Sequence, residues 1–67
     1  MTIGENIRNK RHEYDIEQQE LAQRIGVSKA MICGIEKGVK MPSVAVLVSI
    51  ADTLHCSVDE LIGRKVS

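Results

Sequence analysis

Apolar side chains recur at helical spacing along almost the whole chain, and no segment alternates in the manner of a strand. Ile3 and Ile7 stand four residues apart, and Leu21 and Ile25 repeat that spacing, which places each pair on one face of a helix. The pattern predicts an all-α fold with five helices. The first is expected from Thr2 to a break at Asp15, and the second ends before Gly26. The other three are expected over 28–37, over 44–54, and around Leu61 and Ile62.

Capping residues mark where these helices begin and end. Thr2 with Glu5, and Ser57 with Glu60, have the spacing of a capping box, in which each side chain accepts the other residue's backbone N–H. His55 follows the fourth helix at a position that favours glycine. The remaining expected boundaries are serine caps, glycine stops and one acidic cap left open between two residues: Ser28, Ser43, Gly26, Gly38, and either Asp15 or Glu17.

The length limits what the chain can contain. Sixty-seven residues form a single domain, 1–67, and a chain of this size buries only about 60% of the surface of its unfolded form. Room remains for one small core, but not for a deep substrate cleft. No apolar run is long enough to span a membrane and no leader opens the chain. A cytoplasmic location is therefore expected. Residues 63–67 are expected to form a frayed tail.

Charge, aromatic content and cysteines exclude several classes of function. Nine basic and nine acidic residues give no net charge, which disfavours a uniformly basic nucleic-acid binder but permits a segregated one. Tyr14 is the only aromatic residue among Phe, Trp and Tyr, which strongly disfavours single-strand binding by base stacking. Cys33 and Cys56 lack the spacing of a zinc site and are expected to be reduced. No nucleophile–base set is visible, so we assign no catalytic residue, metal or cofactor.

The most informative stretch is 18–37, where two predicted helices are joined through Gly26. Ala22 is small enough to let the two helices approach each other. Apolar residues such as Ile32 and Ile35 then hold the second helix at a fixed angle. A helix held in this way, with its other face free, can enter the major groove of DNA.

Many positions of this stretch and its flanks resemble a known family. They are Glu20-Leu21-Ala22-Gln23-Arg24-Ile25-Gly26-Val27-Ser28, Ile32, Ile35-Glu36-Lys37-Gly38 and Pro42-Ser43, with Ile7 and Arg11 upstream and Leu47, Ile50-Ala51, Leu54 and Val58-Asp59-Glu60-Leu61 downstream. The chain is similar over about 2–62 to the Cro and phage-repressor family, also called the XRE type. The resemblance implies a compact five-helix, lambda-repressor-like domain with its helix-turn-helix at helices two and three.

The resemblance also implies a function and a set of binding residues. The implied function is that of a transcriptional regulator, with repression as the expected role. It would bind double-stranded operator DNA as a homodimer on an inverted repeat and would lie at the nucleoid when bound. Lys29, Ala30 and Gly34 match the positions that usually meet base edges, flanked by Met31 and Cys33. The positions expected at phosphates are Gln18 at a helix N-terminus, Ser28, Lys37 and Lys40.

Three features refine this expectation. Arg11 and Glu36 match a family ion pair that would fix the third helix to the first. Ala30 and Gly34 are nearly bare where the family often has long polar side chains, so direct readout would rest on Lys29 and the remainder on DNA shape. Glu17 stands where a capping Ser or Thr is usual.

The helix over 44–54 supports a rival interpretation. It is apolar almost all round, and a single helix of so short a chain cannot bury every face, so Ala45 and Val46 are expected to be exposed to a partner. The partner would be a second copy, or another protein if the fold serves as an interaction module or an antitoxin-like binder. Cys56 is expected in the core, and His12 at the surface.

Overall fold

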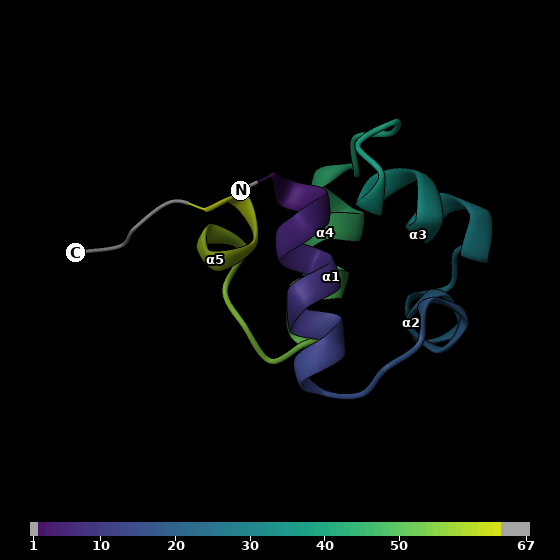
Figure 1. Cartoon of the computed structure of the whole chain (residues 1–67), viewed down its shortest axis with the longest axis horizontal. Helices are drawn as coiled ribbons and strands as arrows, with labels where there is room; N and C mark the ends of the chain where they lie inside the picture. The colour runs from purple at the N-terminus through teal and green to yellow at the C-terminus, as the bar shows by residue number, and fades with distance from the viewer. Residues whose placement is uncertain (1, 64–67) are drawn as a thin grey trace.

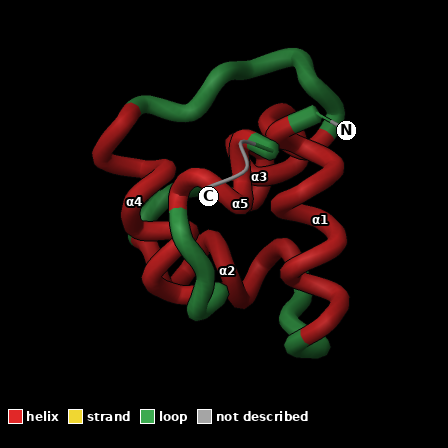
Figure 2. Tube along the Cα trace, turned by 90° about the vertical axis from the view of Figure 1, so that its left-hand side faces the viewer, coloured by secondary structure: helices red, strands yellow, loops and turns green. Residues whose placement is uncertain are grey.

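The computed structural model describes residues 2–63, and that part of the chain contains helices and loops only (Figures 1 and 2). The helices are α1 (Ile3–Glu13), α2 (Gln18–Ile25), α3 (Lys29–Glu36), α4 (Val44–Thr53) and α5 (Val58–Ile62). The predicted all-α fold and its order of helices are confirmed. Of the predicted tail 63–67, residues 64–67 lie outside the described residues, and Gly63 is the left-handed C-cap of α5.

The first predicted capping box is present, and the second is only half formed. Glu5 N–H donates to Thr2 Oγ1 over 3.1 Å, and Thr2 N–H donates to Glu5 Oε1 over 3.0 Å. Ser57 Oγ accepts the Glu60 N–H, but no hydrogen bond between described residues returns from Ser57 N–H to the Glu60 carboxylate. That carboxylate lies 3.6 Å from Lys10 Nζ instead, because α1 packs beside α5 and offers it a cation.

The turns between helices adopt left-handed backbone conformations. Gly26 has φ 77°, as the prediction of a glycine stop requires. His55 and Asp15 both have φ 53° without being glycine, and the ring of His55 packs edge-on against Tyr14 with centroids 5.5 Å apart. Glu17 is the N-cap residue of α2, although its side chain accepts no capping hydrogen bond. Of the two candidates, Glu17 therefore occupies the N-cap position, but the predicted acidic side-chain cap of α2 is not formed.

All five helices contribute to one core. In Figure 1, α2 and α3 lie to one side of α1 and α5 lies to the other. The helix α1 packs against α3 and α5, and α4 packs against α2 and α5. The largest fully buried side chains are Ile7, Leu21, Ile32, Ile50, Leu54 and Leu61. Burial of such side chains is worth about 1.5–3 kcal/mol each. Ile32 of α3 belongs to this cluster, so its packing stabilises the position of α3 against the other helices.

The exposure of α4 differs in part from the prediction. Val46 packs against the core, because it lies one turn before the fully buried Ile50 and shares its face. The expectation that Val46 is exposed was therefore wrong, whereas Ala45 is exposed as expected. The large apolar side chains that α4 leaves exposed are Val44, 80% exposed, and Val48, 42% exposed.

No helix in the range 2–63 combines the length and the apolar character needed to cross a membrane.

Candidate nucleic-acid interface

The turn between α2 and α3 is fixed by a small residue and a backbone hydrogen bond. Ala22 is 2% exposed, which lets the two helices approach closely. Val27 N–H donates to the Ala22 carbonyl oxygen over 3.0 Å and Gly26 supplies the left-handed C-cap. Ser28 then caps α3 by accepting the Met31 N–H over 3.1 Å. The helix-turn-helix predicted over 18–37 is present, and α3 leaves it with one face outward.

A buried ion pair joins α3 to α1, as the resemblance implied. Arg11 Nε donates to Glu36 Oε2 over 2.8 Å, and its Nη2 donates to Glu36 Oε1 over 3.0 Å. Arg11 Nη1 also donates to the Ile16 carbonyl oxygen over 2.9 Å. The side chains of Arg11 and Glu36 are only 9% and 4% exposed. Because a two-pronged contact of this kind fixes both side chains, it sets the position of α3 relative to α1.

Gln18 belongs to the same network. Its Nε2 donates one N–H to Glu36 Oε1 over 3.0 Å, which fixes the amide and leaves its second N–H for a phosphate. The backbone offers another donor set, since α2 begins at Gln18 and its N-cap residue Glu17 provides no side-chain acceptor. Free N–H groups at a helix N-terminus attract anions. A phosphate contact at Gln18 therefore remains a prediction that rests on these backbone groups and on the second N–H of the side-chain amide.

The residues predicted at base edges share the outward face of α3. At about 100° per residue, Lys29, Cys33, Lys37, Ala30 and Gly34 span an arc of about 140°, opposite the buried Ile32 and Ile35. Lys29, Ala30 and Lys37 are exposed, while Cys33 and Gly34 are half-buried. Met31 lies outside this arc and packs against the core, so the structure brings it to the edge of the candidate surface.

Lys40 joins this face from the loop that follows α3. The N–H groups of Val39 and Lys40 both donate to the Gly34 carbonyl oxygen, over 2.9 and 3.1 Å. A Cβ placed on Gly34 would lie 3.3 Å from both Cγ and Cδ of Lys40. The aliphatic part of this lysine therefore lies over Gly34.

Two residues of α1 also reach this surface, which the sequence analysis did not assign to it. A hollow of about 340 Å³ is lined by Arg8, Arg11, His12, Gln18, Cys33, Glu36 and Lys37. Arg8 and His12 stand four residues apart, one turn of α1, and His12 is exposed as expected. That spacing was the signal in the sequence that Arg8 and His12 share one face of α1. It could not be used without knowing that this face of α1 meets the ends of α2 and α3.

The charges of the described residues are segregated although the chain is neutral. Glu36 is paired with Arg11, and Glu20 with Arg24, while Glu13 and Glu60 both lie near Lys10. Within 2–63, the lysines on and beside α3 form no ion pair. They are Lys29, Lys37 and Lys40. Glu36, the acidic residue that shares a hollow with Lys37, is therefore neutralised by Arg11, while the lysines themselves are exposed.

Metal and thiol chemistry find no support in the described part of the chain. There, no three His, Cys, Asp or Glu side chains stand together as metal ligands would. Cys33 and Cys56 are free thiols and both are half-buried, so Cys56 packs against the core rather than inside it. Burial raises the pKa of the Cys56 thiol, and the nearby Glu60 carboxylate raises it further. A raised thiol pKa lowers the thiolate fraction and with it the reactivity.

Comparisons with known proteins agree with this geometry. Residues 7–61 match the helix-turn-helix family model HTH_3. The chain is 39% identical over 64 residues to the cryptic phage CTXphi transcriptional repressor RstR of Vibrio cholerae, covering 96% of this chain and 57% of the repressor. It spans 44% to 57% of the length of four curated relatives, which is about half.

Two of the solved structures that are similar to this chain were determined with DNA. The P22 c2 repressor in complex with synthetic operator 9T has a TM-score of 0.90 and 31% identity, covering 97% of this chain and 98% of that chain. SinR, the master regulator for biofilm formation, in complex with DNA has a TM-score of 0.84 and 33% identity, covering 90% of this chain and 97% of that chain.

Proposed function

The chain belongs to the HTH_3 helix-turn-helix family, and on that premise we propose that it is a transcriptional regulator that binds double-stranded operator DNA through α3. The observation that carries the proposal is the outward face of α3. It presents Lys29 and Lys37, which form no ion pair with any residue in the range 2–63, while Glu36 on the same helix is neutralised by Arg11. A helix with one face anchored and a basic face free suits the major groove.

The proposed contacts divide into two groups. Lys29 and Ala30 meet base edges, where an ammonium group can donate to guanine and a methyl group can touch the methyl of thymine. Phosphate contacts come from the N-terminus of α2 at Gln18, from Ser28 and from Lys37, with Arg8 as an added cation in the hollow between α1 and α3. Cys33 lies between the base-contacting and the phosphate-contacting residues, and we assign it no polar contact with DNA.

The regulator is proposed to act as a homodimer on an inverted repeat, as a repressor that occupies its operator in the cytoplasm. Two-fold related half-sites about one helical turn apart suit two copies of such a domain. Val44 and Val48 support a dimer, because they form an apolar strip on α4 that is 80% and 42% exposed. A strip of this kind is stabilised when a second copy covers it.

The experiment is selection from a random-sequence duplex library at increasing salt, followed by sequencing of the bound DNA. We expect enriched inverted repeats and an affinity that falls steeply with salt. Each phosphate contact contributes about 0.9 to the slope of log affinity against log salt. Lys37→Ala should lower that slope by about one contact per protomer, and Lys29→Ala should relax base preference at one position of each half-site.

The matched control is Lys10→Ala, which removes the same charge from α1 beside Glu13 and Glu60, away from α3. It should leave the slope and the selected sequence unchanged. Binding that is equally weakened by Lys10→Ala and Lys37→Ala would show that general charge, and not the α3 face, attracts DNA. Enrichment of single half-sites instead of inverted repeats would contradict the dimer.

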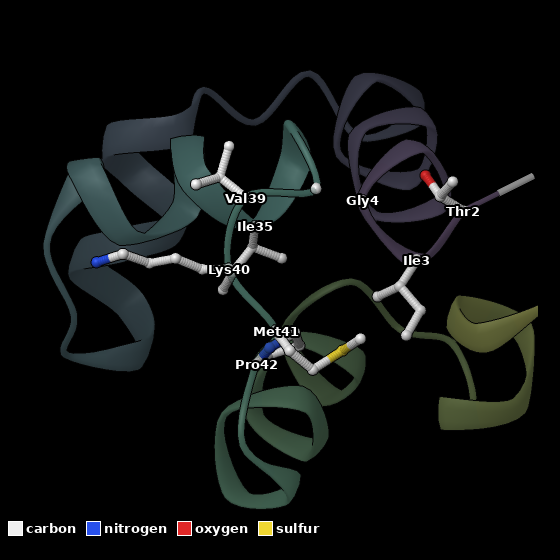
Figure 3. A pocket seen from close by; sticks show the side chains of 9 residues that line it. Thr2, Ile3, Gly4, Ile35, Val39, Lys40, Met41 and Pro42 are labelled. Atoms are coloured by element: carbon white, nitrogen blue, oxygen red, sulfur yellow. The ribbon is translucent and has the colours of Figure 1, made fainter.

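A second function, contact with another protein, is favoured by one surface. Val39 and Met41 are 78% and 77% exposed, and both line a pocket of about 360 Å³ together with Ile3, Ile35 and Pro42 (Figure 3). Under this alternative the fold is a partner-binding or antitoxin-like module. The same selection separates the two functions, since a module of this kind enriches no sequence even at low salt.

A further inference from the structure

The outward face of α3 has a gap in its side chains. Gly34 follows Ala30 by one turn and shares its face, so it stands where a groove-facing helix would present its next side chain. A glycine in a helix interior costs about 1 kcal/mol relative to alanine. The cost is not explained by a turn at this position, because the positive φ angles among the glycines belong to Gly26, Gly38 and Gly63.

The loop after α3 fills this gap. It turns back at Gly38, where φ is 79°, and the N–H groups of Val39 and Lys40 are both bound to the Gly34 carbonyl oxygen. Two hydrogen bonds to one carbonyl hold the backbone of Lys40 next to α3. Pro42 follows two residues later and restricts the chain as it leaves. The base of the Lys40 side chain is therefore fixed by the backbone around it.

The side chain of Lys40 then runs over the bare position. Its Cγ and Cδ would each lie 3.3 Å from a Cβ on Gly34, and its Cβ would lie 3.7 Å away. Figure 3 shows this side chain extended away from Ile3 and Met41, with its ammonium group at the far end. Lysine commonly lays its methylene stem on an apolar surface and leaves the charge in water. Here the surface is the helix backbone that Gly34 exposes.

From this arrangement we propose that Lys40 is a base-reading residue, whose stem rests in the space left by Gly34 and whose ammonium group donates to a guanine N7 or O6 in the major groove. The inference rests on the proposed function and deepens it. It changes the role predicted from the sequence, in which Lys40 touches a phosphate. It also gives Gly34 a role, because a side chain longer than that of alanine at this position would displace the Lys40 stem.

The contrast with Lys37 favours base reading over a phosphate contact. Lys37 is the C-cap residue of α3 and is exposed, and it lines the hollow toward α1 that also holds Arg8, where the phosphate contacts are proposed. A flexible cation suffices to neutralise a phosphate, since that contact carries no sequence information. Discrimination between bases needs a donor at a fixed place, and the stem of Lys40 has such a place.

The first test compares the sequences selected by the wild-type protein, by Lys40→Met and by Lys37→Ala. Methionine keeps an unbranched apolar stem over Gly34 and removes only the ammonium group. We expect Lys40→Met to lose preference for guanine at one position of each half-site, by about 5- to 150-fold, with the other positions unchanged. Lys37→Ala should weaken all sequences alike. A uniform loss with Lys40→Met would overturn the proposal and leave the proposed function standing.

The second test changes the seat instead of the charge. Gly34→Gln should displace the Lys40 stem and alter preference at the same base position that Lys40→Met affects. An effect at a different position would contradict the shared seat. Nuclear Overhauser contacts between the Lys40 methylenes and the Gly34 Hα atoms, measured on the free protein, check the seat without DNA. Their absence would overturn the proposal. If the wild-type protein enriches no sequence while these contacts are present, the proposed function fails, and base reading fails with it.

Discussion

The two faces of α3 are built on opposite principles. The inward face is crowded with fixed contacts: Glu36 accepts from both Arg11 and Gln18, and Ile32 and Ile35 are buried. The outward face carries few side chains, and Ala30 and Gly34 contribute almost none. The contacts of the inward face therefore fix the position of α3 in the fold, and the side chains of the outward face remain free to contact a binding partner.

Two ion pairs show why position matters more than distance. Arg24 Nη2 and Glu20 Oε2 are 2.6 Å apart, with side chains 51% and 44% exposed. Arg11 and Glu36 are slightly farther apart at 2.8 Å, but nearly all of their surface is buried. Water screens the exposed pair and competes with it, whereas the buried pair leaves an uncompensated charge if either partner is removed.

The largest expected effect therefore comes from the inward face. Glu36→Ala should lower the free energy of unfolding by about 3–5 kcal/mol, because it strands the Arg11 guanidinium inside the protein. Urea unfolding followed by circular dichroism measures the change. The control, Glu20→Ala, removes the shorter but exposed pair and should cost no more than about 0.5 kcal/mol.

A double variant sharpens this comparison. Arg11→Met with Glu36→Leu replaces both charges by apolar side chains of similar size, and it should recover much of the stability that Glu36→Ala loses. If Glu36→Ala and Glu20→Ala cost the same, the inward face does not depend on the buried pair, and the distinction between the two faces is wrong.

The second largest effect is expected at Gly4, where α1 crosses the end of α3. A Cβ on Gly4 would overlap the Ile35 carbonyl oxygen and lie 2.6 Å from that of Glu36. Both obstacles are backbone atoms, so Gly4→Ala must separate the helices and should cost about 1–3 kcal/mol. Thermal unfolding of this variant gives the cost.

Gly34→Ala is the matched control on the outward face. The atoms that its Cβ would meet belong to the Lys40 side chain, which can move by a few tenths of an ångström. Alanine also favours a helix interior over glycine by about 1 kcal/mol. The unfolding temperature of Gly34→Ala should therefore stay the same or rise, and a fall as large as that of Gly4→Ala would mean that the outward face is packed as tightly as the inward one.

The sequence predicted those features that depend on local pattern. The helices, the left-handed turn at Gly26 and the cap at Ser28 follow from residues within one or two turns of each other, and all are confirmed. The Arg11–Glu36 pair is a long-range contact, and it was predicted only through the family resemblance. The family itself is confirmed by the match over 7–61.

The features that the sequence missed depend on how distant segments meet. Nothing near Gly4 in the chain indicates that the carbonyl groups of Ile35 and Glu36 will lie against it. The half-formed capping box at Ser57 has the same origin, since Glu60 is drawn toward Lys10 on another helix. The bare position at Gly34 was noticed in the sequence, but its relation to Lys40 required the path of the loop.

The smallest expected effect is at Ser28, the N-cap residue of α3, which has one role in stability and another in the proposed DNA contact. Its hydroxyl caps α3 by accepting the Met31 N–H, and its position at the start of the helix is also the one expected near a phosphate. Ser28→Ala should lower the free energy of unfolding by about 1 kcal/mol through loss of the cap. Ser28→Asp restores a capping oxygen, so its stability in urea should be close to that of the wild-type protein.

Ser28→Asp separates the two roles, because it keeps the cap and adds a negative charge. In the proposed complex this charge would stand close to the DNA backbone, and affinity for the selected operator should fall well below that of Ser28→Ala, most strongly at low salt where charges are least screened. Ser57→Asp makes the same replacement at the N-cap of α5, which lies on the far side of α1 from α3 (Figure 1), and it should leave affinity unchanged. Equal affinity of Ser28→Asp and Ser57→Asp for the operator would show that the start of α3 does not lie close to DNA. The proposal that α3 enters the major groove would then be wrong, even if its inward contacts are intact.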